Sequence, residues 1–225
     1  MKKSLLIFVL LFPSITYLFW SLASHNAKKL PIFGPREVVA NKTGETDTAY
    51  HQLPAFSFTN QYGNNVTQNT IKNKILVVDY FFTTCKSICP IMSTQIARVQ
   101  QNTMDFNDIV FLSHTVDPLY DTVEVMLDYA EKMGAINGRW HFLTGNKKEL
   151  YDLARNGYFV TAMEGDGGTE DFIHSEKLVL LDKQQRIRGF YDGTDKEDVD
   201  RLIDEINVLK KEEFIPWKDK KNGNN

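Results

Sequence analysis

A run of apolar and aromatic residues, Ile75–Phe82, leads directly into two cysteines and a proline. Its near-continuous hydrophobicity predicts a strand whose two faces are both buried, as in a parallel sheet covered by helices. Pro90 favours the first turn of a following helix, because its fixed backbone torsion suits that position and its missing N–H is not needed there. Cys85 and Cys89 therefore fall in a strand–loop–helix connection, in a chain that contains no other cysteine.

The position of this cysteine pair favours a functional site over a structural disulfide or two inert thiols. In a loop that enters a helix, residues four positions apart can bring both sulfurs to one point. Free amides and the positive end of the helix dipole lower thiol pKa values there. Such a pair can bind a soft metal or exchange a disulfide. Structural zinc is disfavoured because the chain has no second cysteine pair, whereas thiolates joined by an imidazole suit copper.

Hydrophobic patterns along the chain predict alternating strands and helices. Strands, including a hairpin that turns at residues 61–65, are expected at residues 53–58, 75–82, 109–116, 140–143, 178–182 and 187–191. Helices are expected to begin near Pro90, at the N-caps Asp121 and Asp195, and at Lys147. The order β-α-β-α, then a β-hairpin and a helix, predicts an α/β domain with a thioredoxin-like fold.

A third metal ligand is expected among the five histidines: His25, His51, His114, His141 and His174. The first lies near the N-terminal apolar segment, and the second opens the domain in an exposed position. His114 and His141 fall within predicted strands, where structural roles are expected, although His114 could support a ligand at its strand end. His174 stands between a Gly-rich loop and a strand, a position that faces the cysteine loop in a thioredoxin-like fold. The residues alone leave this choice open.

The N-terminus predicts membrane attachment. Lys2 and Lys3 precede an apolar run, 5–22, which is close to the length that crosses a bilayer and longer than a usual signal-peptide core. We expect residues 1–27 to be an uncleaved signal anchor, with a cleaved signal peptide as the alternative. The first arginine is Arg36, which disfavours a mitochondrial presequence. A bacterial inner (cytoplasmic) membrane is expected, with the soluble domain facing the periplasm or cell exterior.

The balance of charged residues argues against one class of function, nucleic-acid binding. The 26 basic and 29 acidic residues give a net charge of −3, so no basic excess indicates nucleic-acid binding. Residues 28–50 lack periodicity and are expected to be a linker. We expect the thioredoxin-like, copper-binding domain at residues 51–215 and a polar tail at 216–225.

Several segments together resemble one family. Residues 84–90 are similar to its CxxxCP element, residues 115–122 to its D-P-x-x-D-T turn, and residues 171–175 to its histidine-bearing segment. Over residues 53–209 the chain resembles the Sco (SenC) family of copper proteins for cytochrome c oxidase assembly. The resemblance implies a thioredoxin-like fold, one N-terminal membrane anchor, and the copper ligands Cys85, Cys89 and His174. Lys86 and Tyr120 depart from the family pattern and could change partner recognition.

The resemblance also implies a function. It indicates a copper metallochaperone, not an enzyme, that delivers one copper per chain, as Cu(I) or Cu(II), to the binuclear copper site of an oxidase subunit. One alternative is a membrane-anchored thiol–disulfide reductase that keeps the oxidase cysteines reduced through Cys85 and Cys89. Another is a copper or redox sensor. Asp79, six residues before Cys85, is either a proton relay for thiol chemistry or a hydrogen-bonded strand residue.

Overall fold

A computed structural model describes residues 12–13, 16–17, 29–40, 46–160 and 175–213. The chain divides into two compact units, residues 30–207, and residues 1–29 with 208–225. The elements in chain order are β1 (Arg36–Ala40), β2 (Thr46–Tyr50), β3 (Ser57–Asn60), β4 (Asn65–Thr67), β5 (Ile75–Phe81), α2 (Ile88–Asn102), β6 (Ile109–Thr115), α3 (Val123–Lys132), β7 (Trp140–Thr144), α4 (Lys147–Asp152), η1 (Leu153–Tyr158), β8 (Lys177–Leu181), β9 (Ile187–Asp192) and α5 (Lys196–Glu212).

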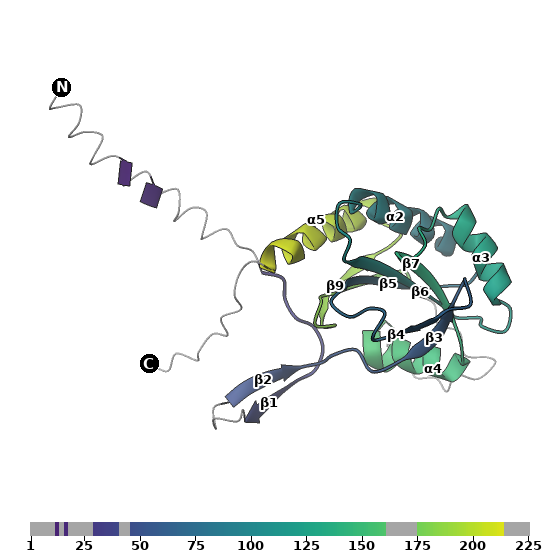
Figure 1. The fold of residues 1–225 in the computed structure, drawn as a ribbon, viewed down its shortest axis with the longest axis horizontal. Coiled ribbons are helices and arrows are strands. Elements are labelled where there is room, and N and C mark those ends of the chain that lie inside the picture. The colour runs from purple at the N-terminus through teal and green to yellow at the C-terminus, as the bar shows by residue number, and fades with distance from the viewer. Residues whose placement is uncertain (1–11, 14–15, 18–28, 41–45, 161–174, 214–225) are drawn as a thin grey trace. The chain divides into compact units, whose positions relative to one another are not determined.

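The central sheet has the strand order β4-β3-β7-β6-β5-β8-β9 (Figure 1). Strands β5, β6 and β7 are parallel, and the remaining strands add to them in antiparallel fashion. Every residue of β5 and β6 is buried, which confirms the predicted double-sided burial of the apolar run. The register pairs Phe81 with Thr115, so the loops that leave β5 and β6 start side by side at the same edge of the sheet.

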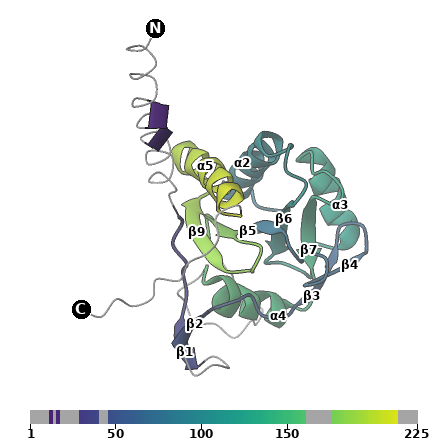
Figure 2. The ribbon, with the colours of Figure 1, turned by 60° about the vertical axis from the view of Figure 1, so that its left-hand side comes forward.

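Helices cover both faces of this sheet. Helices α2, α3 and α5 lie on one side and α4 on the other (Figures 1 and 2). On the α4 side, Tyr80 shares a buried cluster with Leu150 and Tyr151. On the opposite side, Phe81 stacks on Tyr129 of α3 with ring centroids 5.5 Å apart. Each such side chain contributes about 1.5–3 kcal/mol by leaving water. The predicted α/β class is confirmed.

The start of α3 differs from the prediction. Thr122, not Asp121, is the N-cap, and its side chain accepts a hydrogen bond from the Val125 amide at 3.4 Å. Asp121 is instead completely buried. The predicted helix that starts at Lys147 is α-helical for only six residues and continues as the π-helical segment η1.

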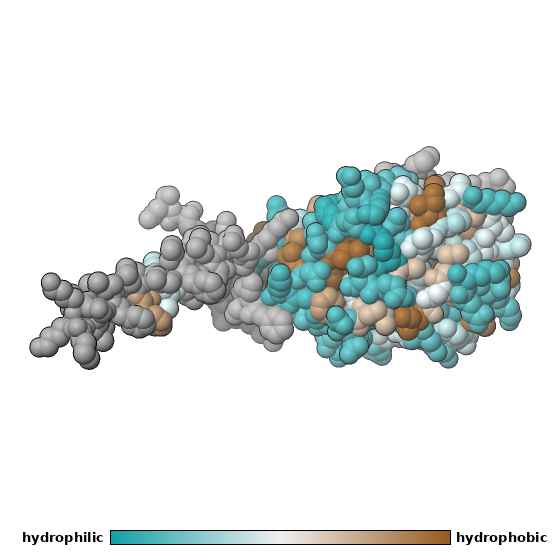
Figure 3. Space-filling view, turned by 90° about the horizontal axis from the view of Figure 1, so that it is seen from above, coloured by the Kyte–Doolittle hydropathy of each residue, from teal (hydrophilic) through white to brown (hydrophobic). Residues whose placement is uncertain are grey.

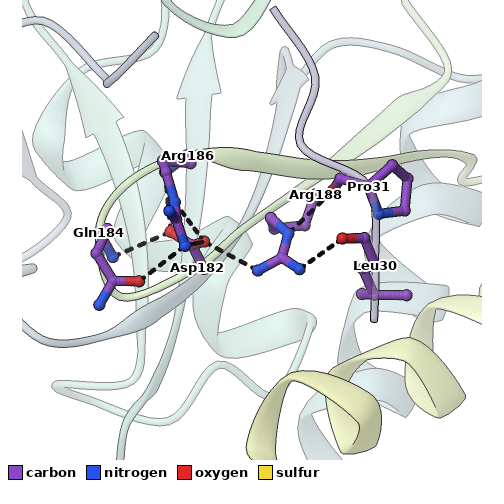
Figure 4. A network of polar contacts seen from close by, with 6 residues as sticks. All are labelled: Leu30, Pro31, Asp182, Gln184, Arg186 and Arg188. Carbon is purple, nitrogen blue, oxygen red and sulfur yellow. Dashed lines mark hydrogen bonds and ion pairs between the residues drawn. The ribbon is translucent and has the colours of Figure 1, made fainter. Parts of the chain in front are cut away.

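The segment 28–50, expected to be a linker, contains regular structure in its described residues. β1 and β2 pair as an antiparallel hairpin. Ahead of it, Leu30 is only 3% exposed. The buried Arg188 side chain donates hydrogen bonds to the carbonyls of Leu30 (2.7 Å) and Pro31 (3.0 Å) and pairs with Asp182 at 3.0 Å (Figure 4). A buried guanidinium needs such acceptors, which explains why this segment is fixed to the β8–β9 hairpin.

No helix formed by the described residues is long and apolar enough to span a membrane. Most of the predicted anchor, residues 1–27, lies outside the residues that the structure describes.

Candidate functional site

The two cysteines lie where β5 gives way to α2. Cys85 sits in the connecting loop, where its amide donates to the Phe82 carbonyl at 3.2 Å. Cys89 lies in the first turn of α2. Both side chains are buried, with exposed fractions of 9% and 3%, and both are free thiols. The strand–loop–helix position predicted from the sequence is therefore confirmed.

The loop brings the two residues into contact. The Cys89 amide donates a hydrogen bond to the Cys85 sulfur at 3.4 Å. The Ser87 hydroxyl lies 3.6 Å from the same sulfur. These groups and the open end of α2 direct positive potential at Cys85. Such an arrangement stabilises a thiolate, which is the form that binds metals and attacks disulfides.

The pKa values of the two thiols are shifted in opposite directions. Burial opposes ionisation of Cys85, but hydrogen bonds from the Cys89 thiol and amide and from Ser87 outweigh it and lower its pKa to about 7. Burial, the hydrogen bond to Cys85 and the charges of Cys85 and Asp79 raise the pKa of Cys89 to about 12. Near neutral pH, Cys85 is therefore the thiol that ionises, while Cys89 stays protonated and donates a hydrogen bond to it.

A buried carboxylate ties the cysteine loop to the neighbouring turn. The Thr83 hydroxyl donates to Asp121 at 2.5 Å and the Thr83 amide donates at 3.2 Å. Thr115, the last residue of β6, also donates its hydroxyl to this carboxylate. Burial raises the pKa of Asp121, although the hydrogen bonds from Thr115 and Thr83 oppose that rise. Asp121 therefore ties the start of the loop that carries Cys85 to the end of β6.

A second buried acid, Asp79, acts electrostatically on Cys89. Asp79 is 1% exposed and accepts a hydrogen bond from the Ser113 hydroxyl at 2.5 Å, while Trp140 donates its indole N–H to Ser113 at 2.8 Å. The other carboxyl oxygen, Oδ2, has no hydrogen-bond partner. Burial raises the pKa of Asp79 to about 7, although the Ser113 hydrogen bond opposes the rise. The structure thus contains both features expected of Asp79, a hydrogen bond within the strand and a raised pKa.

His114 and His141 have structural surroundings. His114 stacks on Tyr80 at 5.1 Å, and its Nε2 lies 3.2 Å from the Tyr158 hydroxyl, on the sheet face opposite Asp79. Burial lowers the pKa of His114 to about 3. His141 lies 3.1 Å from the Asn60 amide, and burial lowers its pKa as well. These contacts fit the structural roles expected for both residues, although the buried Nδ1 of His114 has no hydrogen-bond partner.

The third predicted ligand, His174, lies outside the described residues. His51 is half-buried, and its Nε2 lies 2.9 Å from the Gly157 carbonyl. Within the described part of the chain, no three His, Cys, Asp or Glu side chains gather into a metal site. The pair of adjacent thiols nevertheless provides soft ligands of the kind that copper prefers. The assignment of Cys85, Cys89 and His174 as a ligand set stays a prediction.

Comparison with known proteins decides the family. A family model described as SCO1/SenC matches residues 44–210. The chain belongs to the SCO1/SenC family. This confirms the resemblance predicted from the cysteine, D-P-x-x-D-T and histidine segments.

Among curated relatives, the SCO1 protein homolog of Bacillus subtilis is 26% identical over 71% of this chain and 83% of its own length. A SCO1/SenC family lipoprotein of Bacillus anthracis has a similar structure, with a TM-score of 0.61 and 26% identity over 71% of this chain and 95% of that one. Arabidopsis thaliana ScoI, solved with copper bound, matches with a TM-score of 0.57 and 26% identity, over 71% of this chain and 98% of that one. BsSco matches with a TM-score of 0.60 and 24% identity, over 71% of this chain and 94% of that one. It is described as having a disulfide switch and as a member of the Sco family of cytochrome c oxidase assembly proteins. The fold is therefore that of the thioredoxin-like Sco structures.

Sequence reasoning missed three contributors to the site. Ser87 was part of the CxxxC spacing but carried no predicted role. Ser113 and Trp140, which complete the contact to Asp79, come from other strands and are distant in sequence. The contact between Ser113 and Asp79 did leave a signal in the sequence. Each residue is a polar interruption in an apolar run, and the two lie at matching positions of the paired strands β5 and β6.

Proposed function

We propose that this chain is a copper metallochaperone that delivers copper to the binuclear copper site of cytochrome c oxidase. The observation that supports this most strongly is the pair of free, adjacent thiols at the edge of the sheet, of which Cys85 ionises near neutral pH. Two thiolates and the imidazole of His174 form a donor set suited to copper in either oxidation state. We assign one copper to each chain.

The chain's own groups explain how cargo can enter and leave. Cys85 is available as a thiolate, whereas Cys89 must lose its proton when metal binds, so binding releases protons and strengthens as pH rises. A ligand set of only three residues leaves room for an incoming donor. A thiolate of the recipient can therefore bind the metal before the bonds to Cys85 and Cys89 break. Reprotonation of Cys89, whose pKa is high, then favours release.

The relatives support this reading of the site. Arabidopsis thaliana ScoI was solved with copper bound, and BsSco is described as a member of a family of oxidase assembly proteins. We extend copper binding and oxidase assembly to this chain on the basis of its family membership. We further propose that residues 1–27 anchor the chain in the bacterial inner membrane and that the domain at 51–215 faces the periplasm or cell exterior.

A thiol–disulfide reductase is the second candidate, and the opposite pKa values of the two thiols favour it. The Cys85 thiolate would attack a disulfide of the oxidase copper site, forming a mixed disulfide and releasing one substrate thiolate. Cys89, once deprotonated, would attack the Cys85 sulfur and release the second thiol. This step leaves a Cys85–Cys89 disulfide, and a dithiol reductant must regenerate the reduced pair. Asp79, whose charge acts on Cys89, is the candidate acceptor of the Cys89 proton.

One experiment separates the two functions. The full-length, reduced chain would be loaded with Cu(I) in detergent and mixed with the soluble copper-site domain of the oxidase subunit from the same organism. The proposal predicts copper transfer to the reduced domain from wild type, and impaired loading in His174→Ala. Reduction of the oxidised domain at equal rates by wild type and His174→Ala, without copper transfer, would instead favour the reductase.

A further inference from the structure

The turn between β6 and α3 exposes two large apolar side chains. Leu119 is 83% exposed and Tyr120 is 55% exposed. The next two residues have structural roles, because Asp121 is buried and Thr122 is the N-cap of α3. Scattered single apolar residues on a surface are ordinary, but adjacent ones at a turn tip indicate an interaction surface.

This turn is held firmly in place. The amides of Tyr120 and Asp121 both donate to the Asp117 carbonyl, at 3.1 and 2.9 Å. The Asp121 carboxylate then binds the hydroxyl and amide of Thr83, two residues before Cys85. Leu119 and Tyr120 are therefore fixed beside the cysteine loop and need little ordering when a partner binds, which favours association.

The cysteine loop and the first turn of α2 supply two more exposed side chains near this turn. Ile91, two residues after Cys89 in the first turn of α2, is 48% exposed. Lys86, between the two cysteines, is exposed and is the only charged residue in 82–91. Elsewhere on the face covered by α2, α3 and α5, apolar side chains form separate patches among polar ones (Figure 3). A small apolar rim with one positive charge fits a transient complex better than a permanent one.

We propose that Ile91, Leu119, Tyr120 and Lys86 form the docking surface for the protein that receives the metal. The inference rests on the delivery function proposed above. Ligand exchange requires the recipient's donor atoms to reach the metal, so the residues around the cysteine loop must be covered in the transfer complex. The recipient's metal-ligand loop accordingly presents apolar side chains to the rim and a carboxylate to Lys86.

The test measures copper transfer from the full-length, Cu(I)-loaded chain to the oxidase copper-site domain at increasing concentrations of that domain. The Leu119→Ser/Tyr120→Ser variant should bind copper like wild type but need at least about tenfold more recipient for half-maximal transfer rate. Lys86→Glu should also weaken transfer and should reverse its dependence on salt. Val38→Ser is the matched control, because Val38 is 76% exposed in the β1–β2 hairpin and should leave transfer unchanged.

The outcomes distinguish this surface from the delivery function itself. If wild type and the double variant transfer copper with the same concentration dependence, the docking surface is wrong and delivery stands. If the double variant loses copper affinity as well, the turn acts on the ligand site and the docking surface is again wrong. If wild type binds copper but transfers none to the domain, both proposals fall.

Discussion

The buried carboxyl group of Asp79 lowers the stability of the folded protein when it is ionised. The group is buried beside Ser113 and has one oxygen without a partner. Burial raises its pKa from 3.8 to about 7, which means that the folded state favours the neutral form. An unfolded chain releases this proton near pH 4, whereas the native chain keeps it until about pH 7. Between these values the unfolded state binds fewer protons at this group, so the contribution of Asp79 to stability falls as pH rises and is constant above about pH 7.

Asp79→Asn should remove this contribution, whereas the opposing contribution of the buried His114, whose pKa is lowered to about 3, remains in both chains. At pH 8 the variant should be more stable than wild type by up to about 4 kcal/mol, whereas near pH 4 the two should differ little. Urea denaturation of the full-length chain at both pH values measures this, with the exposed Asp128→Asn as control. A stability difference between Asp79→Asn and wild type that does not grow between pH 4 and pH 8 would contradict the raised pKa.

At the scale of elements, the contact between Asp121 and Thr83 joins the β6–α3 turn to the cysteine loop. The Thr83 and Thr115 hydroxyls donate to different oxygens of Asp121. Asp121→Asn replaces one of these oxygens by an N–H₂ group that cannot accept, so one of the two hydroxyls loses its acceptor. We expect a loss of about 2 kcal/mol of stability and weaker copper binding, because the loop that carries Cys85 loses its support.

Denaturation and copper competition assays measure these two effects of Asp121→Asn. Asp128→Asn is again the control, because its ion pair with Lys132 is on the surface and contributes little. Unchanged copper affinity together with reduced stability would show that Asp121 holds the fold but not the ligand geometry.

Arg188 fixes the segment that precedes the β1–β2 hairpin. Its guanidinium is buried and binds two carbonyls and Asp182 (Figure 4). Arg188→Ala should cost about 3 kcal/mol and should increase hydrogen exchange at residues 30–34, because buried acceptors lose their donor. Arg186→Ala, at a more exposed side chain that also pairs with Asp182, should cost much less. Equal effects of the two variants would show that the segment is not held by Arg188.

These two elements also show where sequence reasoning stops. Asp121 satisfies the local pattern of an N-cap with Glu124 three residues later, yet Thr122 takes that role. The burial of Asp121 depends on Thr83, which comes from a different strand connection. Arg188 lies in an apolar strand, and besides Asp182 it binds two backbone carbonyls more than 150 residues earlier. Non-local polar contacts of this kind leave no periodic signal in one sequence.

For the whole molecule, hydrophobic patterning predicted most of the domain. The runs at 75–82, 109–116, 178–182 and 187–191 all became strands because their residues are buried on the sheet. The cysteine pair was located correctly because its spacing and Pro90 depend only on local geometry. The hairpin at residues 36–50 was not predicted, since its strands are mostly exposed and polar and lack an alternating pattern.

The central claim is that Cys85, Cys89 and His174 hold one copper. Its most direct test is copper titration of the reduced, full-length chain, comparing wild type with His174→Ala and with His25→Ala as a matched control. We predict one tightly bound copper per chain in wild type and His25→Ala, with a thiolate-to-Cu(II) absorption band that His174→Ala loses or shifts. Absence of stoichiometric binding in wild type, or identical binding and spectra in His174→Ala, would contradict the account.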